Sequence, residues 1–233
     1  MTRTRSTRLA ALLAIPLLMA ACSSSAAKPS AAPSAINAPA PTPVPANTAP
    51  ADQSGCPTSQ PVALAAGQTR LVTVQTDKGA IVITIHADWS PIAAGNFVAL
   101  ASCGYYDGVI FHRVVPGFVI QGGDGQYGRT PNVDASLIGR GGPPYTIQDE
   151  PVTQLYHRGT VAMARTSQPN SVNSQFFIVL DDGAKSSLAS ANTYQIIGEV
   201  TSGLDAVDKI AAAADKEIPT NPVVMTKVTV ANP

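Results

Sequence analysis

Short stretches with strand-like patterns of hydrophobic and polar residues recur along the chain from about residue 70. They cover residues 70–76, 80–86, 160–164, 174–180, 194–200 and 223–230. Two more short strands flank a Pro116-Gly117 turn within residues 111–124. We therefore predict about eight strands in one domain, with a hairpin connection at Thr76-Asp77-Lys78-Gly79.

Two other segments have helical spacing. The first begins with Ser90 as an N-cap and Pro91 at the first helical position, and Gly104 ends it. Its inward face would carry Ile92, Asn96, Phe97 and Leu100. The second begins at a predicted capping box, residues 202–205, and carries Leu204, Val207, Ile210 and Ala211 on one face. Because strands dominate and adjoin one another, we predict a closed antiparallel sheet with helices at its ends rather than a parallel α/β sheet.

The first 21 residues have the features of a secretory signal. Arg3, Arg5 and Arg8 precede an apolar run, residues 9–21, which is too short to span a bilayer by itself. The small residues before Cys22 resemble the lipobox of bacterial lipoproteins, so we expect Cys22 to be lipidated and N-terminal in the mature chain. Ordinary signal cleavage with a free Cys22 is the alternative.

Residues 22–55 have a composition that cannot bury a core. They contain seven prolines and are rich in Ala and Ser, which predicts a disordered tether, and the folded domain would span residues 56–233. The other two cysteines, Cys56 and Cys103, would lie in an oxidising compartment. We predict a disulfide between them, with two unpaired thiols as the alternative.

Composition and motifs disfavour several functional classes. The chain has 15 basic and 15 acidic residues and a net formal charge of zero, so nothing indicates a nucleic-acid partner. There is no G-x-S-x-G motif of a hydrolase, and His86, His112 and His157 have no metal-site spacing. The glycine-rich residues 125–144 lack the phosphate-binding G-x-x-x-x-G-K-[ST] pattern and are predicted to form a surface loop.

The candidate chemistry lies in residues 111–124, where a hairpin would bring a cation, an amide and apolar side chains together. Alternation predicts one face of the first strand to carry Phe111, Arg113 and Val115. On the return strand Phe118 and Ile120 would share one face, and Val119 and Gln121 the other. With no nucleophile beside them, such residues would bind and polarise a substrate without attacking it.

These residues and the segment 173–178 resemble the two signatures of the cyclophilins. Matching pieces occur at residues 96–97, 139–142, 149–150 and 197–200, and the resemblance runs from about Leu71 to Val230. It implies a mainly β fold, an eight-stranded closed antiparallel barrel capped by two α-helices. It also implies peptidyl-prolyl cis–trans isomerase activity (EC 5.2.1.8) without a cofactor.

Position by position, the resemblance implies that Arg113 and Gln121 are catalytic. The implied substrate-binding residues are Phe118, Val119, Ala164, Arg165, Gln175, Phe177, Leu188 and Tyr194. His112 also has a counterpart, for which we favour a structural role. The departures from the family pattern are Val119 in place of methionine, Arg165 in place of asparagine, Trp89 outside the usual tryptophan region, and a long loop at residues 125–137.

We therefore expect a monomer, lipid-anchored on the outer side of the cell membrane, that rotates X–Pro bonds and assists folding of extracytoplasmic proteins. Its partners would be proline-containing peptides or unfolded segments, with the membrane contacted through the anchor only. The alternative is a membrane-tethered module that binds proline peptides with little turnover. Arg113 and Gln121 favour the enzyme, whereas Arg165 and the long loop are compatible with the binding module.

Overall fold

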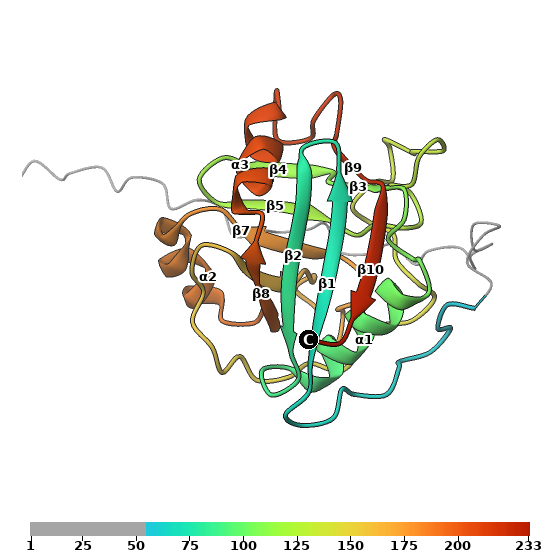
Figure 1. Cartoon of the computed structure of the whole chain (residues 1–233), viewed down its shortest axis with the longest axis vertical. Helices are drawn as coiled ribbons and strands as arrows, with labels where there is room; N and C mark the ends of the chain where they lie inside the picture. Colours follow the sequence, from blue (N-terminus) through green and yellow to red (C-terminus); the bar gives the residue numbers. More distant parts are fainter. Residues whose placement is uncertain (1–54) are drawn as a thin grey trace, which may run out of the picture. The chain divides into compact units, whose positions relative to one another are not determined.

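A computed structural model of the chain describes residues 55–233 (Figure 1). The predicted signal, Cys22 and all of the predicted tether except its last residue lie outside the described residues. The described strands are β1 (Thr69–Thr76), β2 (Gly79–His86), β3 (Val109–Ile110), β4 (Arg113–Val115), β5 (Val119–Gly122), β6 (Thr160–Met163), β7 (Phe176–Val179), β8 (Ile196–Ser202), β9 (Val224–Met225) and β10 (Lys227–Ala231). The described helices are α1 (Pro91–Ser102), the short 3₁₀-helix η1 (Asp182–Ala184), α2 (Lys185–Ala191) and α3 (Leu204–Ala213).

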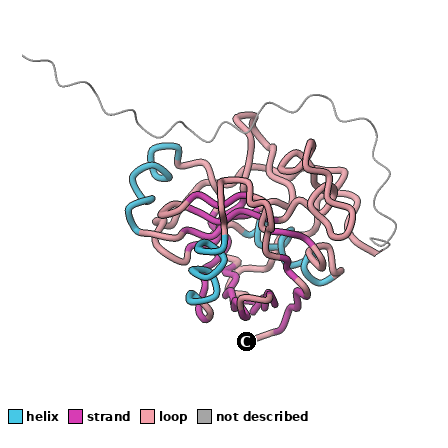
Figure 2. Tube along the Cα trace, turned by 90° about the horizontal axis from the view of Figure 1, so that it is seen from above, coloured by secondary structure: helices cyan, strands magenta, loops and turns pink. Residues whose placement is uncertain are grey.

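Eight strands form one curled antiparallel sheet in the order β10-β1-β2-β8-β6-β7-β5-β4, and β3 pairs separately with β9. The predicted closed barrel is wrong, because the two edge strands, β10 and β4, do not pair with each other and the sheet remains an open half-barrel. Figure 2 shows this curled sheet from above, with loops around it.

The edge at β4 stays open because a loop occupies the hydrogen-bonding positions that a closing strand would need. The backbone N–H of Val114 donates to the carbonyl of Glu217 at 2.8 Å, and the N–H of Phe111 donates to the carbonyl of Val223 at 2.9 Å. Covering an edge in this way satisfies its backbone groups and blocks pairing with other chains. The single strand predicted over residues 223–230 is accordingly two strands, β9 and β10, with different partners.

Strand alternation divides the buried side chains between two clusters. On β7, Phe176 and Ile178 join the main core, whereas Phe177 and Val179 face the opposite side. The same division holds for β5, where Ile120 is in the main core and Val119 faces the opposite side. We call the second group the outer cluster: Val119, Tyr156, Ala162, Phe177, Val179, Ala184, Leu188, Tyr194 and Ile196. This part of the sheet is therefore buried on both faces, which explains its continuous apolar sequences.

Three α-helices, rather than the predicted two, accompany the sheet in the described residues. Helices α1 and α3 pack at opposite ends of β1 and β2 (Figure 1) and contribute Phe97 and Val207, among others, to the main core. Helix α2 was not predicted, because its sequence KSSLASA contains only one large apolar residue, Leu188. That leucine packs in the outer cluster.

The helix starts depend in part on groups that were not predicted. Ser90 is the N-cap residue of α1 and Pro91 its first residue, as predicted, but the Ser90 side chain makes no capping hydrogen bond. The carboxylate of Glu150 accepts instead from the N–H groups of Ile92 and Ala93, at 2.8 and 2.9 Å. Helix α3 has no side-chain cap either, so the predicted capping box is wrong: its N-cap is Gly203, whose φ of 90° favours glycine.

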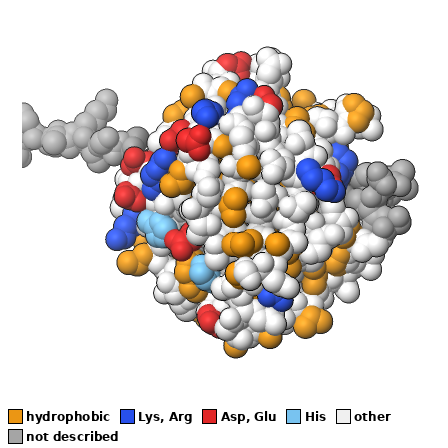
Figure 3. Space-filling model, viewed as in Figure 1, with side chains coloured by type: hydrophobic (Ala, Val, Ile, Leu, Met, Phe, Trp, Pro, Cys, Tyr) orange, Lys and Arg blue, Asp and Glu red, His pale blue; other side chains and the backbone are white. Residues whose placement is uncertain are grey.

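On the solvent face of β1, β2 and β10, hydrophobic side chains are only scattered (Figure 3). The fully buried hydrophobic residues of these strands, such as Val72, Ile83 and Val228, point into the main core. Among the described residues, no helix has the length and apolar character needed to cross a membrane.

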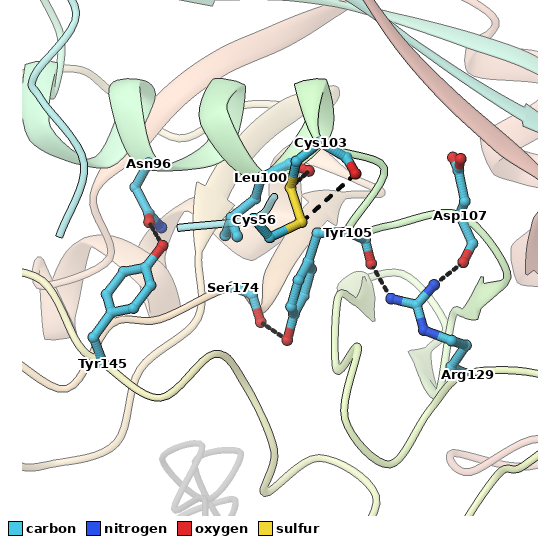
Figure 4. The surroundings of a disulfide bond; sticks show 9 residues. All are labelled: Cys56, Asn96, Leu100, Cys103, Tyr105, Asp107, Arg129, Tyr145 and Ser174. Carbon is cyan, nitrogen blue, oxygen red and sulfur yellow. Dashed lines mark hydrogen bonds between the residues drawn. A yellow bond between two sulfur atoms is a disulfide. The ribbon is translucent and has the colours of Figure 1, made fainter. Parts of the chain in front are cut away.

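The predicted disulfide between Cys56 and Cys103 is confirmed, with an S–S distance of 2.05 Å (Figure 4). It ties the beginning of the described chain to the C-terminal end of α1. The sulfur of Cys103 lies 3.2 Å from the carbonyl oxygen of Leu100. Since a disulfide sulfur carries no hydrogen, this approach is a contact rather than a hydrogen bond.

Replacing both cysteines, as in Cys56→Ser with Cys103→Ser, should lower the free energy of unfolding by about 2–4 kcal/mol, because a link over 47 residues restricts the unfolded chain. Urea unfolding of the domain measures the difference. Dithiothreitol should bring the wild type to the midpoint of the double variant and leave that variant unchanged. Equal midpoints for the oxidised wild type and the variant would show that the bridge adds no stability.

Candidate functional site

The strand register aligns four side chains in a row across β4, β5, β7 and β6. Arg113 lies opposite Gln121, Gln121 opposite Phe177, and Phe177 opposite Ala162. Directly paired residues project to the same face of a sheet, so all four lie on the face away from the main core. With strands about 4.8 Å apart, the row is roughly 14 Å long. It places a cation at one end and apolar groups at the other.

The outer cluster forms the apolar part of this site. Phe177 packs edge-on against Tyr194, with ring centroids 5.4 Å apart and an interplanar angle of 86°. Half-buried Phe118, Ala164 and Trp89 pack against the cluster and leave part of their surface open to solvent. The structure thus brings together six of the predicted substrate-binding residues: Phe118, Val119, Ala164, Phe177, Leu188 and Tyr194.

Several members of this apolar surface were not predicted from the sequence. Tyr156 and Ile196 belong to the outer cluster, and Trp89 packs against it from the turn before α1. Tyr156 donates its hydroxyl to the carbonyl of Tyr194 at 2.8 Å. Burial raises the pKa of Tyr156 to about 12 and also raises the pKa of Tyr194, so both hydroxyls stay protonated at neutral pH.

The side-chain amide of Gln121, in the row, is hydrogen-bonded to that of Gln175 beside it. The Nε2 of Gln175 donates to the carbonyls of Gly139 and Gly141, at 3.0 and 2.9 Å. Both amide hydrogens of Gln175 are then in use, so its oxygen must face the Nε2 of Gln121, which donates to it at 3.1 Å. Gln175 is buried, and its hydrogen bond fixes the amide of Gln121; its predicted role in substrate binding stays a prediction.

Arg165 does not join the row. Its guanidinium pairs with the carboxylate of Asp149 at 3.0 Å and donates to the carbonyls of Gln168 and Thr193. These contacts connect the loops that contain Asp149, Gln168 and Thr193. The N–H of neighbouring Ala164 donates to the carbonyl of Gln175 at 2.8 Å, so this amide hydrogen is not available to a peptide. The predicted role of the 164–165 edge in peptide pairing stays a prediction.

The side chain of Arg113 is held by Glu217, a residue that no sequence motif indicated. The Nε of Arg113 donates to Oε1 of Glu217 at 2.6 Å, across 104 positions of sequence. The Nη1 of Arg113 is buried and has no hydrogen-bond partner within residues 55–233.

Two predicted side-chain orientations in the hairpin are wrong. Phe111 packs in the main core rather than beside Arg113, because it precedes β4 and is not part of the alternating strand. Phe118 packs against the outer cluster, whereas Ile120 lies in the main core. Phe118 ends the Pro116-Gly117 turn, in which its N–H donates to the carbonyl of Val115 at 2.9 Å, so alternation begins only with the next residue.

His112 is buried next to Arg113, and neither of its ring nitrogens has a hydrogen-bond partner among the described residues. Burial lowers its pKa to about 4, partly opposed by the charge of Asp124 and assisted by that of Arg113. The ring is therefore neutral at neutral pH. This fits the structural role that we favour and does not fit a proton donor.

Other groups of polar residues lie outside the row. Two histidines flank one carboxylate on the face shown in Figure 3: His86 and His157 approach Glu199 at 3.8 and 3.6 Å. Within residues 55–233, no cluster of three or more His, Cys, Asp or Glu side chains has an arrangement that could hold a metal ion. A surface pocket of about 420 Å³ lies beside the β1–β2 turn, lined in part by Asp77, Lys78 and Asn221, and it contains no member of the row.

Comparison with known proteins adds the family context. The family described as "Cyclophilin type peptidyl-prolyl cis-trans isomerase/CLD" matches residues 71–230. A probable peptidyl-prolyl cis-trans isomerase of Brucella abortus (strain 2308) is 40% identical over 157 residues, covering 66% of this chain and 78% of the relative. A peptidyl-prolyl cis-trans isomerase of Acinetobacter baylyi is 38% identical over 143 residues, covering 60% of this chain and 71% of the relative.

Solved structures agree with this assignment. The crystal structure of a cyclophilin type peptidyl-prolyl cis-trans isomerase from Cryptosporidium parvum superposes with a TM-score of 0.59 at 27% identity, covering 71% of this chain and 99% of that one. The same protein in the presence of the dipeptide Ala-Pro gives a TM-score of 0.58 at 27% identity, covering 70% of this chain and 99% of the other.

The buried neutral His112 should make stability depend on pH. Between pH 6.5 and about 4 the unfolded chain binds a proton at this histidine that the folded chain does not. The free energy of unfolding should therefore fall as the pH is lowered through this window, by at most about 1.4 kcal/mol per pH unit. Urea unfolding at several pH values measures the slope, and His112→Gln should reduce it.

Carboxylates titrate in both the wild type and His112→Gln, so their effect cancels in the difference between the two pH slopes of the unfolding free energy. A direct NMR titration of the His112 ring provides a second measurement if the variant folds poorly. Equal slopes in the two proteins, or a ring that titrates near 6.5, would contradict the proposed burial effect.

Proposed function

The chain belongs to the cyclophilin-type peptidyl-prolyl cis–trans isomerases, and we propose that it is a lipid-anchored member acting on proteins outside the cytoplasmic membrane. Its activity is rotation about X–Pro bonds (EC 5.2.1.8). The proposal adds three things to that activity: the residues that perform it, the compartment, and the kind of client. The row from Arg113 to Ala162 is the observation that supports the first of these.

The chemistry requires a moderate reduction of a rotational barrier. Conjugation of the amide gives rotation about an X–Pro bond a barrier of about 18–20 kcal/mol. Turnover on the order of 100 per second corresponds to a barrier of roughly 14–15 kcal/mol. The site therefore has to supply about 4–5 kcal/mol, which a few well-placed polar contacts and a desolvated pocket can provide.

Each end of the row has a separate task in this proposal. The proline ring packs on the outer cluster against Phe177, where water is excluded. Arg113 donates from a terminal guanidinium nitrogen to the prolyl nitrogen, which favours the pyramidal form of that nitrogen and weakens the conjugation. Gln121, held by Gln175, binds the backbone on one side of the bond while the other side rotates. No nucleophile and no cofactor takes part.

The groups of this scheme all lie within one chain, so a monomer would be sufficient for the proposed activity. The clients would be proline-containing segments of unfolded proteins. The solved relative in the presence of Ala-Pro supports proline peptides as ligands of the fold. Assistance to folding follows from the slowness of uncatalysed isomerisation, which takes tens to hundreds of seconds.

The N-terminal sequence supports the proposed location. The basic residues, the apolar run and the small residues before Cys22 form a lipoprotein-type signal, and residues 22–55 would tether the domain. A proline-rich tether of this length would reach roughly 100 Å when extended and about 30 Å as a coil, so the domain would stand clear of the membrane. The site would then be accessible to proteins emerging outside the cell membrane.

Arg113→Ala should lower kcat/KM on a proline tetrapeptide by roughly 10- to 150-fold, the equivalent of one charged hydrogen bond of about 1.5–3 kcal/mol. A protease-coupled assay of the domain measures the rate. Arg70→Ala serves as the matched control, because Arg70 lies on β1 and its guanidinium donates to Thr69 and Gln68 rather than to a residue of the row. Equal rates for Arg113→Ala and Arg70→Ala would exclude Arg113 from the mechanism.

Metabolic labelling with a palmitate analogue tests the membrane anchor. The full-length chain should incorporate label and fractionate with membranes, and Cys22→Ala should do neither, because Cys22 provides the thiol to which the lipid is attached. Cys56→Ser is the control, since it removes a cysteine that the disulfide occupies. Label that persists in Cys22→Ala would contradict the lipoprotein assignment.

A further inference from the structure

The segment between α3 and β9, residues 214–223, runs beside the edge strand β4 and reaches the cationic end of the row. Two backbone hydrogen bonds attach it there, from Val114 to Glu217 and from Phe111 to Val223, at 2.8 and 2.9 Å. The segment is also closed on itself. Both the N–H and the hydroxyl of Thr220 donate to the carboxylate of Asp215, at 2.9 and 2.6 Å.

Glu217 lies within this closed loop, so its backbone is fixed against the residue next to Arg113. Its side chain is exposed by 60%, yet its Oε1 accepts a 2.6 Å hydrogen bond from the Nε of Arg113. Glu217 is the one residue among 55–233 with a hydrogen bond to the Arg113 side chain. The other face of the arginine is toward the row, where Gln121 lies opposite it on β5.

A guanidinium group held through Nε keeps a defined plane, because the bond fixes rotation about the last side-chain torsions. Neither terminal nitrogen has a hydrogen bond within residues 55–233; Nη1 is buried, so Nη2 is the terminal nitrogen that an acceptor can reach without rearrangement. An exposed ion pair of this kind contributes little to stability. The ion pair between Glu217 and Arg113 therefore affects the orientation of the arginine more than the stability of the fold.

We propose that Glu217 is a positioning residue that holds the guanidinium of Arg113 by Nε, so that a terminal nitrogen is directed at the prolyl nitrogen of the substrate. This inference rests on the proposed function, in which Arg113 is the polarising cation. Glu217 itself touches no substrate. Its carboxylate is 60% exposed, so water reduces, without removing, the opposing effect of its charge on the arginine.

This argument separates the geometric effect of Glu217 from the effect of its charge. Glu217→Gln keeps an oxygen acceptor at the same place and removes the charge. Glu217→Ala removes both. If orientation is what matters, the glutamine variant should keep kcat within about two-fold of the wild type, whereas the alanine variant should lose roughly three- to ten-fold. KM should change little in either variant, because the contact with ground-state substrate is not removed.

The experiment measures kcat and KM of both variants on a proline tetrapeptide, with Asp205→Ala as the control. Asp205 also forms an exposed ion pair on α3, and its partner, at 3.0 Å, is Lys209 rather than a residue of the row. NMR provides a readout independent of activity. The Nε–H resonance of Arg113 should be protected from exchange in the wild type and in Glu217→Gln, and lost in Glu217→Ala.

A double-variant comparison tests whether Glu217 acts through Arg113. In an Arg113→Ala background, Glu217→Ala should cause no further loss of kcat. The assay uses enough enzyme for the catalysed rate to exceed the uncatalysed rate. The same loss in both backgrounds would overturn the proposal, as would wild-type kinetics for Glu217→Ala. An increase in kcat for both variants would also overturn it, by showing that the carboxylate masks the arginine.

The failure of this inference is distinguishable from the failure of the proposed function. A wild-type domain without isomerase activity, or full activity in Arg113→Ala, would contradict the proposed function. A wild type that depends on Arg113 but not on Glu217 would contradict the positioning role alone.

Discussion

The register of four antiparallel strands is the constraint on which the site depends. Pairing of β4, β5, β7 and β6 aligns Arg113, Gln121, Phe177 and Ala162 on one face. A slip by one residue would send each of them to the other face and bring Ile120 out of the main core. Such a slip is costly here because both faces are buried, one against the main core and one in the outer cluster. Packing on the two faces thus fixes the chemistry of the row.

Carboxylates from segments distant in sequence fix the helix start, loop and arginine around the sheet. Glu150 caps α1, the Asp124 carboxylate accepts from the N–H groups of Gly139 and Gly141, and Glu217 holds Arg113. The Asp124 contacts shape the loop whose carbonyls orient Gln175, which in turn orients Gln121. Each of these acids satisfies donors that the regular elements leave unpaired. They also explain how long loops hold a defined site without becoming helices or strands.

Local patterns predicted the elements that are themselves local. The β1–β2 hairpin, helix α1 and the Pro116-Gly117 turn follow from alternation, helical spacing and turn residues. The family resemblance led to Phe177 and Leu188, which the structure brings together. Contacts set by the whole fold were not accessible in this way. Whether the sheet closes depends on what covers β4, the cap of α1 comes from 58 residues away, and Glu217 meets Arg113 across 104 positions. Helix α2 was missed because packing of one leucine, rather than a periodic pattern, stabilises it.

A crystal structure of the domain with a bound proline-containing tetrapeptide tests the account most directly. We predict that the proline ring packs on the outer cluster against Phe177 and that a terminal nitrogen of Arg113 lies within hydrogen-bond distance of the prolyl nitrogen, about 3 Å. The Nε of Arg113 should remain on Glu217 in that complex. A proline ring bound away from Phe177, or an arginine turned away from the prolyl nitrogen while the peptide occupies the row, would contradict the account.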